Sequence, residues 1–468
     1  MSFQRVEERS AVLHKELGVA NLAFTQILHI VGLAWVGVAA RLGPSHVVFW
    51  MLAAVFFYVP SALVVIYLSR IMPLEGGLYQ WSRHGLGSDL AGFLVEWNLW
   101  LFATVLSSEM GLIVATNLSY SLHLPWLAES KWFIALANCI VVGSMVVLAT
   151  IGLGVGKWIH NAGGALMVAL FAALLALPAI NAARGDIAPY NPLPLELPVF
   201  SLLSLNILGK MGFGAFGGFE YVAIFAGECR EARRAIGRSV ILAAPAIAAM
   251  FILGTSSVFA FVQGDRIDLI GPIPQVLSLS TRSLGIGASI VSVVILLSLG
   301  IRLGQLSVTF SGTSRLPLVA GWDNLLPEWF TRLHPRYRTP VNSIRAGGAI
   351  TLALALGSTA GVGSQESFQL LQNAAGIFYA LTYLVLFAIP IVGLRGLSPR
   401  PSMLLRAACA SGWLMTLLYV SLSVFPIIAV PDSGSFTAKI VTVILGANAV
   451  GAVVYLAAGR RKQPQNAV

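Results

Sequence analysis

Four charged side chains stand inside long apolar stretches of the sequence: two carboxylates, Glu109 and Glu220, and two cations, Lys210 and Arg302. A charge in a segment that crosses a bilayer is costly, and such residues commonly bind a charged ligand or carry a proton. Two acids beside two bases predict internal pairing, because one unpaired charge would cost ~3 kcal/mol or more at this depth. The same residues suit a salt-bridge network that fixes how the helices pack, so both roles stay open.

Glycine-rich stretches accompany these charges. Residues 200–227 include the adjacent pair Gly217 and Gly218, followed by Glu220. Each glycine weakens a helix by ~1 kcal/mol relative to alanine, so this stretch predicts a helix that is broken at the pair rather than one that only packs closely. Residues 18–40 likewise place His29 and Gly32 in the middle of an apolar run. Free histidine titrates near neutral pH, so His29 suits a proton-coupled cycle, or it caps the helix interruption.

The elements that must position these residues are membrane helices. Of 468 residues, 57% are hydrophobic and 10% are charged, against ~25% in soluble domains. Apolar runs of about 20 residues, the length that crosses a bilayer, predict an all-α membrane protein with twelve transmembrane helices. The predicted spans are 18–40, 47–70, 90–118, 132–151, 158–181, 200–227, 236–263, 285–313, 342–358, 366–393, 403–428 and 436–458.

The order of these spans predicts a transporter. Two interrupted helices five spans apart are typical of an inverted repeat, whose substrate site lies at the membrane midplane between them. We therefore expect a 5+5 inverted-repeat core with broken helices 1 and 6 over residues 18–393. Residues 394–458 would add two helices, and residues 1–17 and 459–468 would be tails.

The charge distribution predicts the orientation and excludes several classes of protein. Most of the 29 Lys and Arg residues fall in the tails and the loops on one side, so both termini are expected in the cytoplasm of a cell whose plasma (inner) membrane holds the protein. The net charge of +10 forms no patch that suits nucleic acid. Cys139, Cys229 and Cys409 are far apart, so we expect no disulfide, metal or cofactor. Residues 1–18 are polar, which argues against a cleaved signal peptide.

Several motifs resemble those of the amino acid/polyamine/organocation (APC) permeases. They extend over residues 20–345, and the spacing of the later spans extends the resemblance to nearly the whole chain. The quoted segments are GP at 43–44, PLEGGLYQW at 73–81, GFE at 218–220, AGE at 226–228, SR at 314–315, Asp323, Pro327 and HPRYRTP at 334–340. The chain departs from the family at the first break, where His29, Ile30 and Val31 replace the usual G-x-G.

The helix breaks, the buried charges and the resemblance together indicate which residues surround the substrate. Thr309 occupies a position that faces the substrate in similar permeases, and Arg302 lies two turns outward of it. The predicted substrate-binding residues are His29, Gly32, Glu109, Phe216, Gly217, Gly218, Phe219, Glu220 and Thr309. The predicted coupling or gating residues are Lys210, Arg302, Glu109 and Glu220.

These features predict a secondary active transporter that moves an amino acid or a related amine by alternating access. Protons or substrate exchange would supply the energy, as symport or antiport. An enzyme is not expected, because the sequence has no H-E-x-x-H, G-x-S-x-G or Walker motif. A transporter-derived nutrient sensor or a channel remains an alternative function.

Overall fold

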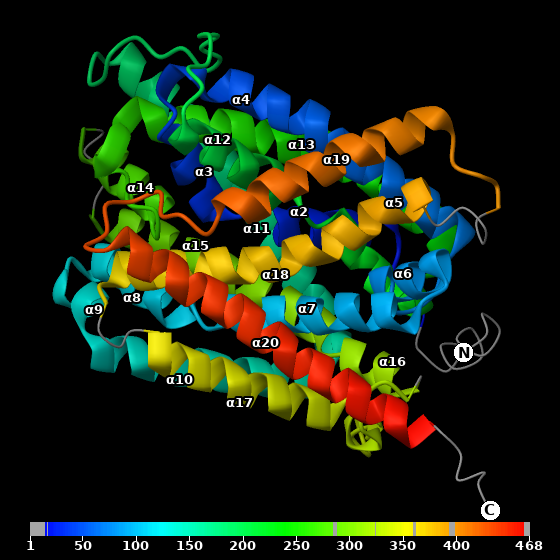
Figure 1. The fold of residues 1–468 in the computed structure, drawn as a ribbon. Helices are drawn as coiled ribbons and strands as arrows, with labels where there is room; N and C mark the ends of the chain where they lie inside the picture. The colour runs from blue at the N-terminus through cyan, green and yellow to red at the C-terminus, as the bar shows by residue number, and fades with distance from the viewer. Residues whose placement is uncertain are drawn as a thin grey trace, which may run out of the picture.

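The fold is given by a computed structural model that describes residues 15, 17–283, 288–322, 324–358, 362–392 and 398–462. Within these ranges the chain forms helices and no sheet (Figure 1), so the predicted all-α class is confirmed. The predicted tail at 1–17 lies almost wholly outside the described residues. So do Asp323 of the loop motif and residues 463–468 of the C-terminal tail.

Within the described residues, ten helical segments are long and apolar enough to cross a membrane. They are α4, η2 and α5 (His46–Ala53, Ala54–Tyr58 and Val59–Ile71), α7 and α8 (Asp89–Ser107 and Met110–Leu122), α10 (Lys131–Ile151), α11 (Leu153–Ala183), α12, η3 and η4 (Leu202–Gly209, Lys210–Ala215 and Phe219–Glu228), α13 (Ala232–Phe261), α15 and α16 (Ala288–Thr313 and Leu316–Trp322), α18 (Ser364–Val392), α19 (Met403–Leu422) and α20 (Ser433–Lys462). Each coincides with a predicted span.

The two remaining predicted spans have different forms. The first is a pair of helices, α2 (Val19–Ile30) and α3 (Leu33–Ala40), which meet at an angle of 47°. The ninth is α17 (Val341–Ser358), an apolar helix shorter than the ~20 residues that usually cross a bilayer. The count of twelve crossings therefore stays a prediction.

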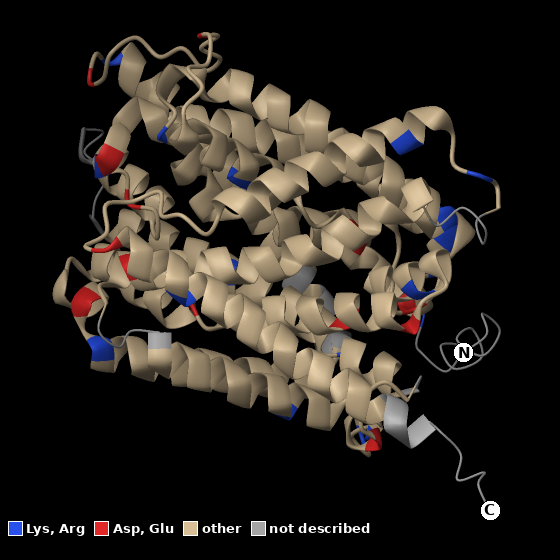
Figure 2. Ribbon diagram, viewed as in Figure 1, with Lys and Arg blue, Asp and Glu red and all other residues tan. Residues whose placement is uncertain are grey.

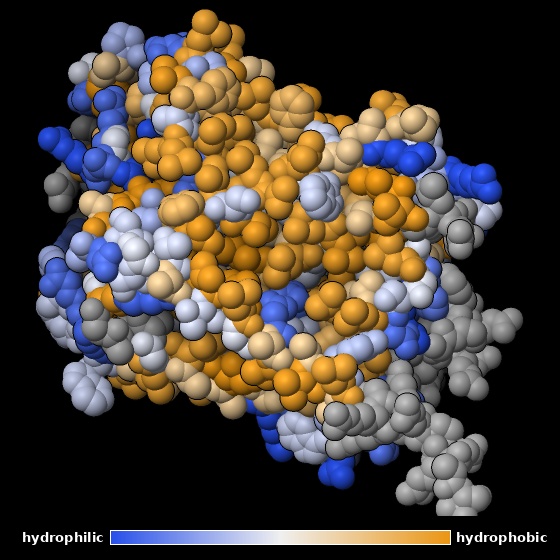
Figure 3. All heavy atoms as spheres, viewed as in Figure 1, coloured by the Kyte–Doolittle hydropathy of each residue, from blue (hydrophilic) through white to orange (hydrophobic). Residues whose placement is uncertain are grey.

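The surface has the pattern of a multi-pass membrane protein. Apolar side chains form most of a broad band across the middle of the face seen in Figure 3. Lys, Arg, Asp and Glu gather at the two ends of the helices (Figure 2). The spans differ in how deeply they are buried. In the most apolar stretch of α7 and α8, 89% is buried inside the protein, so this span is central; in α20 the share is 11%, so that span is peripheral.

Short helices that the sequence analysis did not predict connect the spans. The longest are α6 (Leu78–Leu86) and α14 (Pro272–Ser283). Both are amphipathic and too short to cross a membrane, so neither contains the long apolar run that predicts a membrane span. Gly76 and Gly77 form a turn before α6, with φ of +90° and +43°. A Cβ at Gly77 would lie 2.7 Å from the backbone of Ala223, so this turn packs directly on the sixth span.

Candidate functional site

The first span is interrupted at Val31 and Gly32, which confirms the predicted break and locates it. Gly32 has an extended backbone and Val31 is also non-helical, so helix α2 ends at Ile30 and α3 begins at Leu33. The carbonyl oxygen of Val31 accepts a hydrogen bond from Gln305 Nε2 at 2.6 Å. A backbone group that the helix no longer uses is thus satisfied by a side chain from α15, as a break inside a membrane requires.

The sixth span is interrupted at Gly217 and Gly218, as predicted. The π-helix η3 precedes the pair and the 3₁₀ helix η4 follows it. Gly218 has a φ of +135°, a conformation that side chains with a Cβ rarely adopt. Its N–H donates a hydrogen bond to the hydroxyl of Tyr383 on α18 at 2.7 Å.

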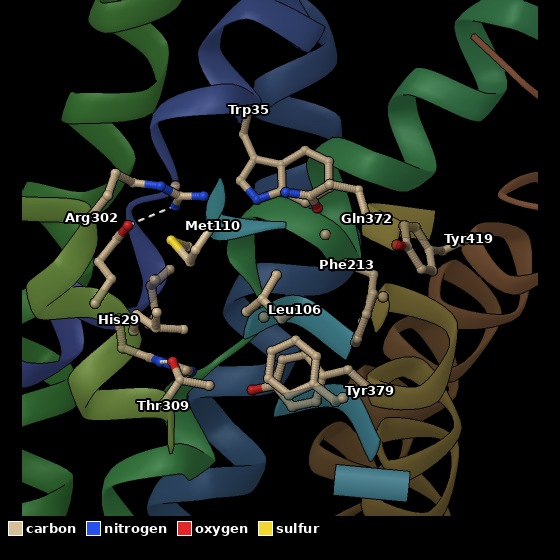
Figure 4. A pocket seen from close by; sticks show the side chains of 18 residues that line it. His29, Trp35, Leu106, Met110, Phe213, Arg302, Thr309, Gln372, Tyr379 and Tyr419 are labelled. Atoms are coloured by element: carbon tan, nitrogen blue, oxygen red, sulfur yellow. Dashed lines mark hydrogen bonds between the residues drawn. The ribbon is translucent and has the colours of Figure 1, made fainter. Parts of the chain in front are cut away.

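A cavity of about 80 Å³ lies between the two breaks (Figure 4). Arg302, Trp35 and Gln372 lie toward one end of the view, and His29, Thr309 and Tyr379 lie toward the other. The lining residues come from both broken helices, α7, α8, α15, α18 and α19. They are His29, Ile30, Gly32, Trp35, Phe102, Leu106, Met110, Phe213, Gly214, Gly217, Arg302, Gln305, Leu306, Thr309, Gln372, Gly376, Tyr379 and Tyr419.

A polar network borders the cavity at the Arg302 end. Arg302 Nη2 lies 3.2 Å from Glu109 Oε1 in a buried ion pair, and Nη1 donates to Gln305 Oε1 at 2.7 Å. Gln372 Nε2 donates to the same Glu109 oxygen at 3.3 Å. Glu109 itself lies at the short interruption between α7 and α8. Since Gln305 also binds Val31, the network connects the first break to α8, α15 and α18.

His29 and Thr309 form the polar boundary of the cavity at the opposite end. His29 Nδ1 lies 3.2 Å from Thr309 Oγ1, and its ring stacks on Tyr221 with centroids 4.0 Å apart. The Tyr221 hydroxyl donates to the carbonyl oxygens of Val308 and Thr309 at 2.6 and 2.8 Å. The two broken helices therefore contact each other and α15 at this end.

Glu220 approaches the cavity only through tyrosine hydroxyls. Tyr379 and Tyr383, one helical turn apart on α18, each donate a hydrogen bond to one of its carboxylate oxygens. Tyr379 lines the cavity, whereas Glu220 lies behind it. The carboxylate is satisfied by neutral donors instead of the cation that the charge balance suggested.

Lys210 is held by neutral groups as well. Its Nζ donates to Asn373 Oδ1 at 2.6 Å and to Ser423 Oγ at 3.5 Å, and it lies 5.7 Å from the ring centroid of Tyr419. Among the described residues, no carboxylate lies within salt-bridge distance of Lys210. The predicted pairing of two acids with two bases therefore exists for Glu109 and Arg302 alone.

The structure places the predicted residues at different depths around the cavity. His29, Gly32, Gly217, Arg302 and Thr309 line it. Glu109, Lys210, Gly218 and Glu220 contact residues that line it or adjoin its lining.

Phe216 and Phe219, which were predicted to bind the substrate, are not among the described residues that line the cavity. Their rings stack on Tyr58, with centroids 4.1 and 4.8 Å apart, and Phe216 also packs on Trp50. At this break Gly217 faces the cavity, and the two phenyl rings fill the space toward η2 and α13.

Gln305, Gln372, Tyr379 and Tyr419 are polar lining residues that the predicted site did not include. Gln305 is one turn from Arg302 along α15, so its spacing was a usable signal. Gln372 is an amide in an apolar run, and this was a weaker signal. The two tyrosines resemble ordinary packing residues in the sequence, because only their partners distinguish them.

Another ion pair lies where the sixth span ends. Arg315 Nε lies 3.1 Å from Glu228 Oε1, and Glu75 accepts a hydrogen bond from the Gly227 N–H at 2.7 Å. Burial, with the nearby Glu228 carboxylate, raises the pKa of Glu75 to about 8, against the lowering effect of Arg315 and the Gly227 N–H. Three motif segments, PLEGGLYQW, AGE and SR, thus meet at one point.

Lys210 and Arg302 have different partners, so replacing each of them should lower the stability of the protein by a different amount. Lys210→Met should lower the stability of the detergent-solubilised protein by about 1 to 2 kcal/mol, because it leaves only neutral acceptors without a donor. Arg302→Met should cost about 3 to 5 kcal/mol, because it leaves Glu109 buried without its cation. Thermal unfolding of the two variants compares them. Equal losses would contradict the assignment of partners.

Comparison with known proteins agrees with this architecture. A family model described as "Amino acid permease" matches residues 17–454. An uncharacterised transporter of Legionella pneumophila is 25% identical over 391 residues, 81% of each chain. A probable agmatine/putrescine antiporter of Lactococcus lactis is 24% identical over 70% of this chain and 68% of its own. A low-affinity putrescine importer of Escherichia coli is 24% identical over 74% of this chain and 75% of its own.

Proposed function

Because the chain belongs to the amino acid permease family, within the APC superfamily, we propose that it is a secondary active transporter of an amino acid or a related amine. Family membership makes it a multi-pass membrane transporter and not an enzyme. The mechanism would be alternating access, in which the cavity opens to each side of the membrane in turn.

The observation that carries this proposal is the cavity enclosed by the two helix breaks. Unwound backbone inside a membrane is tolerated where it borders a cavity, and paired breaks are the usual place for a transported ligand. The volume of about 80 Å³ suits a small molecule. We assign substrate contact to His29, Gly32, Gly217 and Thr309 in this cavity.

The relatives support an amine-bearing substrate. One is named as an agmatine/putrescine antiporter and another as a putrescine importer. The rings of Trp35, Phe213, Tyr379 and Tyr419 border the cavity and can face an ammonium group through their π electrons. The proposal also places the protein in the plasma membrane with both termini in the cytoplasm, following the positive-inside rule.

Counterflow in proteoliposomes tests whether the protein is a carrier. Vesicles loaded with an unlabelled candidate should take up the labelled compound faster than empty vesicles, because a carrier returns loaded more quickly than empty. A panel of amino acids and amines would include putrescine and agmatine. Flux that ignores the internal compound would indicate a channel, and binding without flux would indicate a sensor.

We expect transport that changes with external pH and proceeds without sodium. Glu109, Glu220 and His29 are titratable groups at or next to the cavity, and Thr309 Oγ1 lies beside His29. Replacing sodium with choline should leave the initial rate unchanged, while changing the external pH should alter it. A strict sodium requirement would contradict this and would direct attention to Ser307, Thr309 and Ser311 as hydroxyl ligands.

A further inference from the structure

We propose that Arg302 binds a carboxylate group of the substrate in exchange for Glu109, which takes up one proton at the same time. The transported molecule would therefore carry a carboxylate as well as an amine, and each molecule would be linked to one proton. This inference rests on the proposed transport function and specifies its substrate class and its coupling.

The first support is the position of Arg302 between the cavity and Glu109. Among the described residues that line the cavity, Arg302 is the one permanently charged side chain, and none is a carboxylate. Glu109 is fully buried and reaches the lining only through its contacts with Arg302 and Gln372. A ligand in the cavity therefore meets the guanidinium group first.

The second support is the incomplete binding of the Glu109 carboxylate. Both of its donors share Oε1, at 3.2 and 3.3 Å, while buried Oε2 has no hydrogen-bond partner. Charge-assisted bonds of this kind are usually about 2.7–2.9 Å long. An oxygen without a donor in a low-dielectric setting is a natural acceptor for a proton, and the long Oε1 contacts can be released.

Charge balance links the protonation of Glu109 to the binding of the ligand carboxylate by Arg302. If Glu109 alone gained a proton, Arg302 would be left as an uncompensated buried cation. If a ligand carboxylate arrived alone, it would place two anions beside one cation. Protonation with ligand binding keeps one carboxylate on the Arg302 cation: a proton from the surrounding water forms an O–H bond on Glu109, and the ligand carboxylate replaces that of Glu109 on Arg302. Each event therefore favours the other, and the coupling is reciprocal.

The other charged and titratable groups near this pair do not disturb the exchange. On α15, the neighbour of Arg302 is the neutral Gln305, and α18 presents the neutral Gln372 to Glu109. His29 borders the opposite end of the cavity, Glu220 is held behind Tyr379, and Lys210 lies behind Tyr419. Gln305 is hydrogen-bonded to both Arg302 and the Val31 carbonyl. A movement of Arg302 would therefore also move the backbone at the first break.

This site disfavours a diamine. A ligand with ammonium groups alone would meet the Arg302 cation at close range without a carboxylate of its own to offset it. The chain would then differ in substrate from the relatives named for putrescine and agmatine, although it shares their fold.

Binding to matched pairs of compounds tests the proposal independently of transport. Each common amino acid is compared with its decarboxylated amine on the purified protein by calorimetry, including ornithine with putrescine and arginine with agmatine. At least one amino acid should bind at least tenfold more tightly than its amine. Its affinity should rise by about tenfold for each unit that the pH is lowered while Glu109 is mostly ionised. Amines that bind as well, or no amino acid that binds, would overturn the proposal.

Variants separate the roles of the two residues. Glu109→Gln imitates the protonated acid, so it should keep the carboxylate preference and lose the pH dependence. The double variant Glu109→Gln with Arg302→Gln should lose both. Glu129→Gln, the same change at an exposed position, is the matched control and should behave as wild type. Unchanged pH dependence in Glu109→Gln, or a retained preference in the double variant, would overturn the exchange.

The counterflow assay distinguishes the two levels of proposal. Exchange of an amine in preference to its amino acid would leave the transport function standing and overturn the carboxylate site. Carboxylate binding with the predicted pH dependence, but without flux, would overturn the transport function and leave the site standing.

Discussion

Gly218→Leu is expected to abolish uptake while the protein still inserts into the membrane. The φ of +135° strains any side chain, and a Cβ at this position would lie 2.7 Å from Ile30 Cγ1 and 3.0 Å from His29 Cδ2. A leucine would therefore push the second break away from the first and fill the space beside His29. Uptake in proteoliposomes, with the inserted amount measured on the same vesicles, checks this result.

A control variant at a second glycine separates the effect of backbone strain from that of the steric collision with Ile30 and His29. Gly185 also has a positive φ, +79°, but a Cβ there would meet nothing within 4 Å. Gly185→Leu should therefore keep most of the wild-type uptake. Wild-type transport by a correctly inserted Gly218→Leu variant would remove the second break from the substrate site.

Glu109→Gln is expected to destabilise the ligand-free protein by about 3 to 5 kcal/mol, because it leaves the Arg302 cation buried without a carboxylate. Adding Arg302→Gln should recover most of this loss, since the two amides can hydrogen-bond as neutral groups. Adding Lys210→Gln instead should recover nothing, because Lys210 donates to Asn373 and not to Glu109. Thermal unfolding of the single and double variants forms the double-mutant cycle.

Transport by the stable double variant then decides what the pair does. Stability without transport would mean that Glu109 and Arg302 serve the substrate or the proton as well as the fold. Recovery of both would make the pair structural and reduce the site to the two breaks. A Glu109→Gln variant as stable as wild type would contradict the ion pair itself.

The helices and both breaks follow from local features of the sequence. Apolar length decides whether a segment crosses the membrane, and each predicted span from 18–40 to 436–458 coincides with one helix or with consecutive helical segments. The break at Gly217 and Gly218 was predictable because adjacent glycines weaken a helix wherever it packs. At the first break only Gly32 marked the site, so the sequence indicated an interruption without its register.

The sequence did not indicate which groups the buried charges contact. The sequence shows two acids and two bases near one depth, which permits several pairings. Rotation of each helix about its axis selects among them: Arg302 faces Glu109, whereas Lys210 faces Asn373 and Glu220 faces two tyrosines. Phe216 and Phe219 show the same limit, because residues beside a break point in different directions.

The sequence by itself thus determined a helical membrane protein, its broken first and sixth spans, and the residue types near its centre. These depend on hydrophobic length and backbone propensity, which act over a few neighbouring residues. Only the tertiary structure decided that Gln305 binds Val31, that Tyr379 stands before Glu220, and that Arg302 borders the cavity. Those contacts join residues far apart in the chain, and the packing of all the helices together fixes which side chains meet.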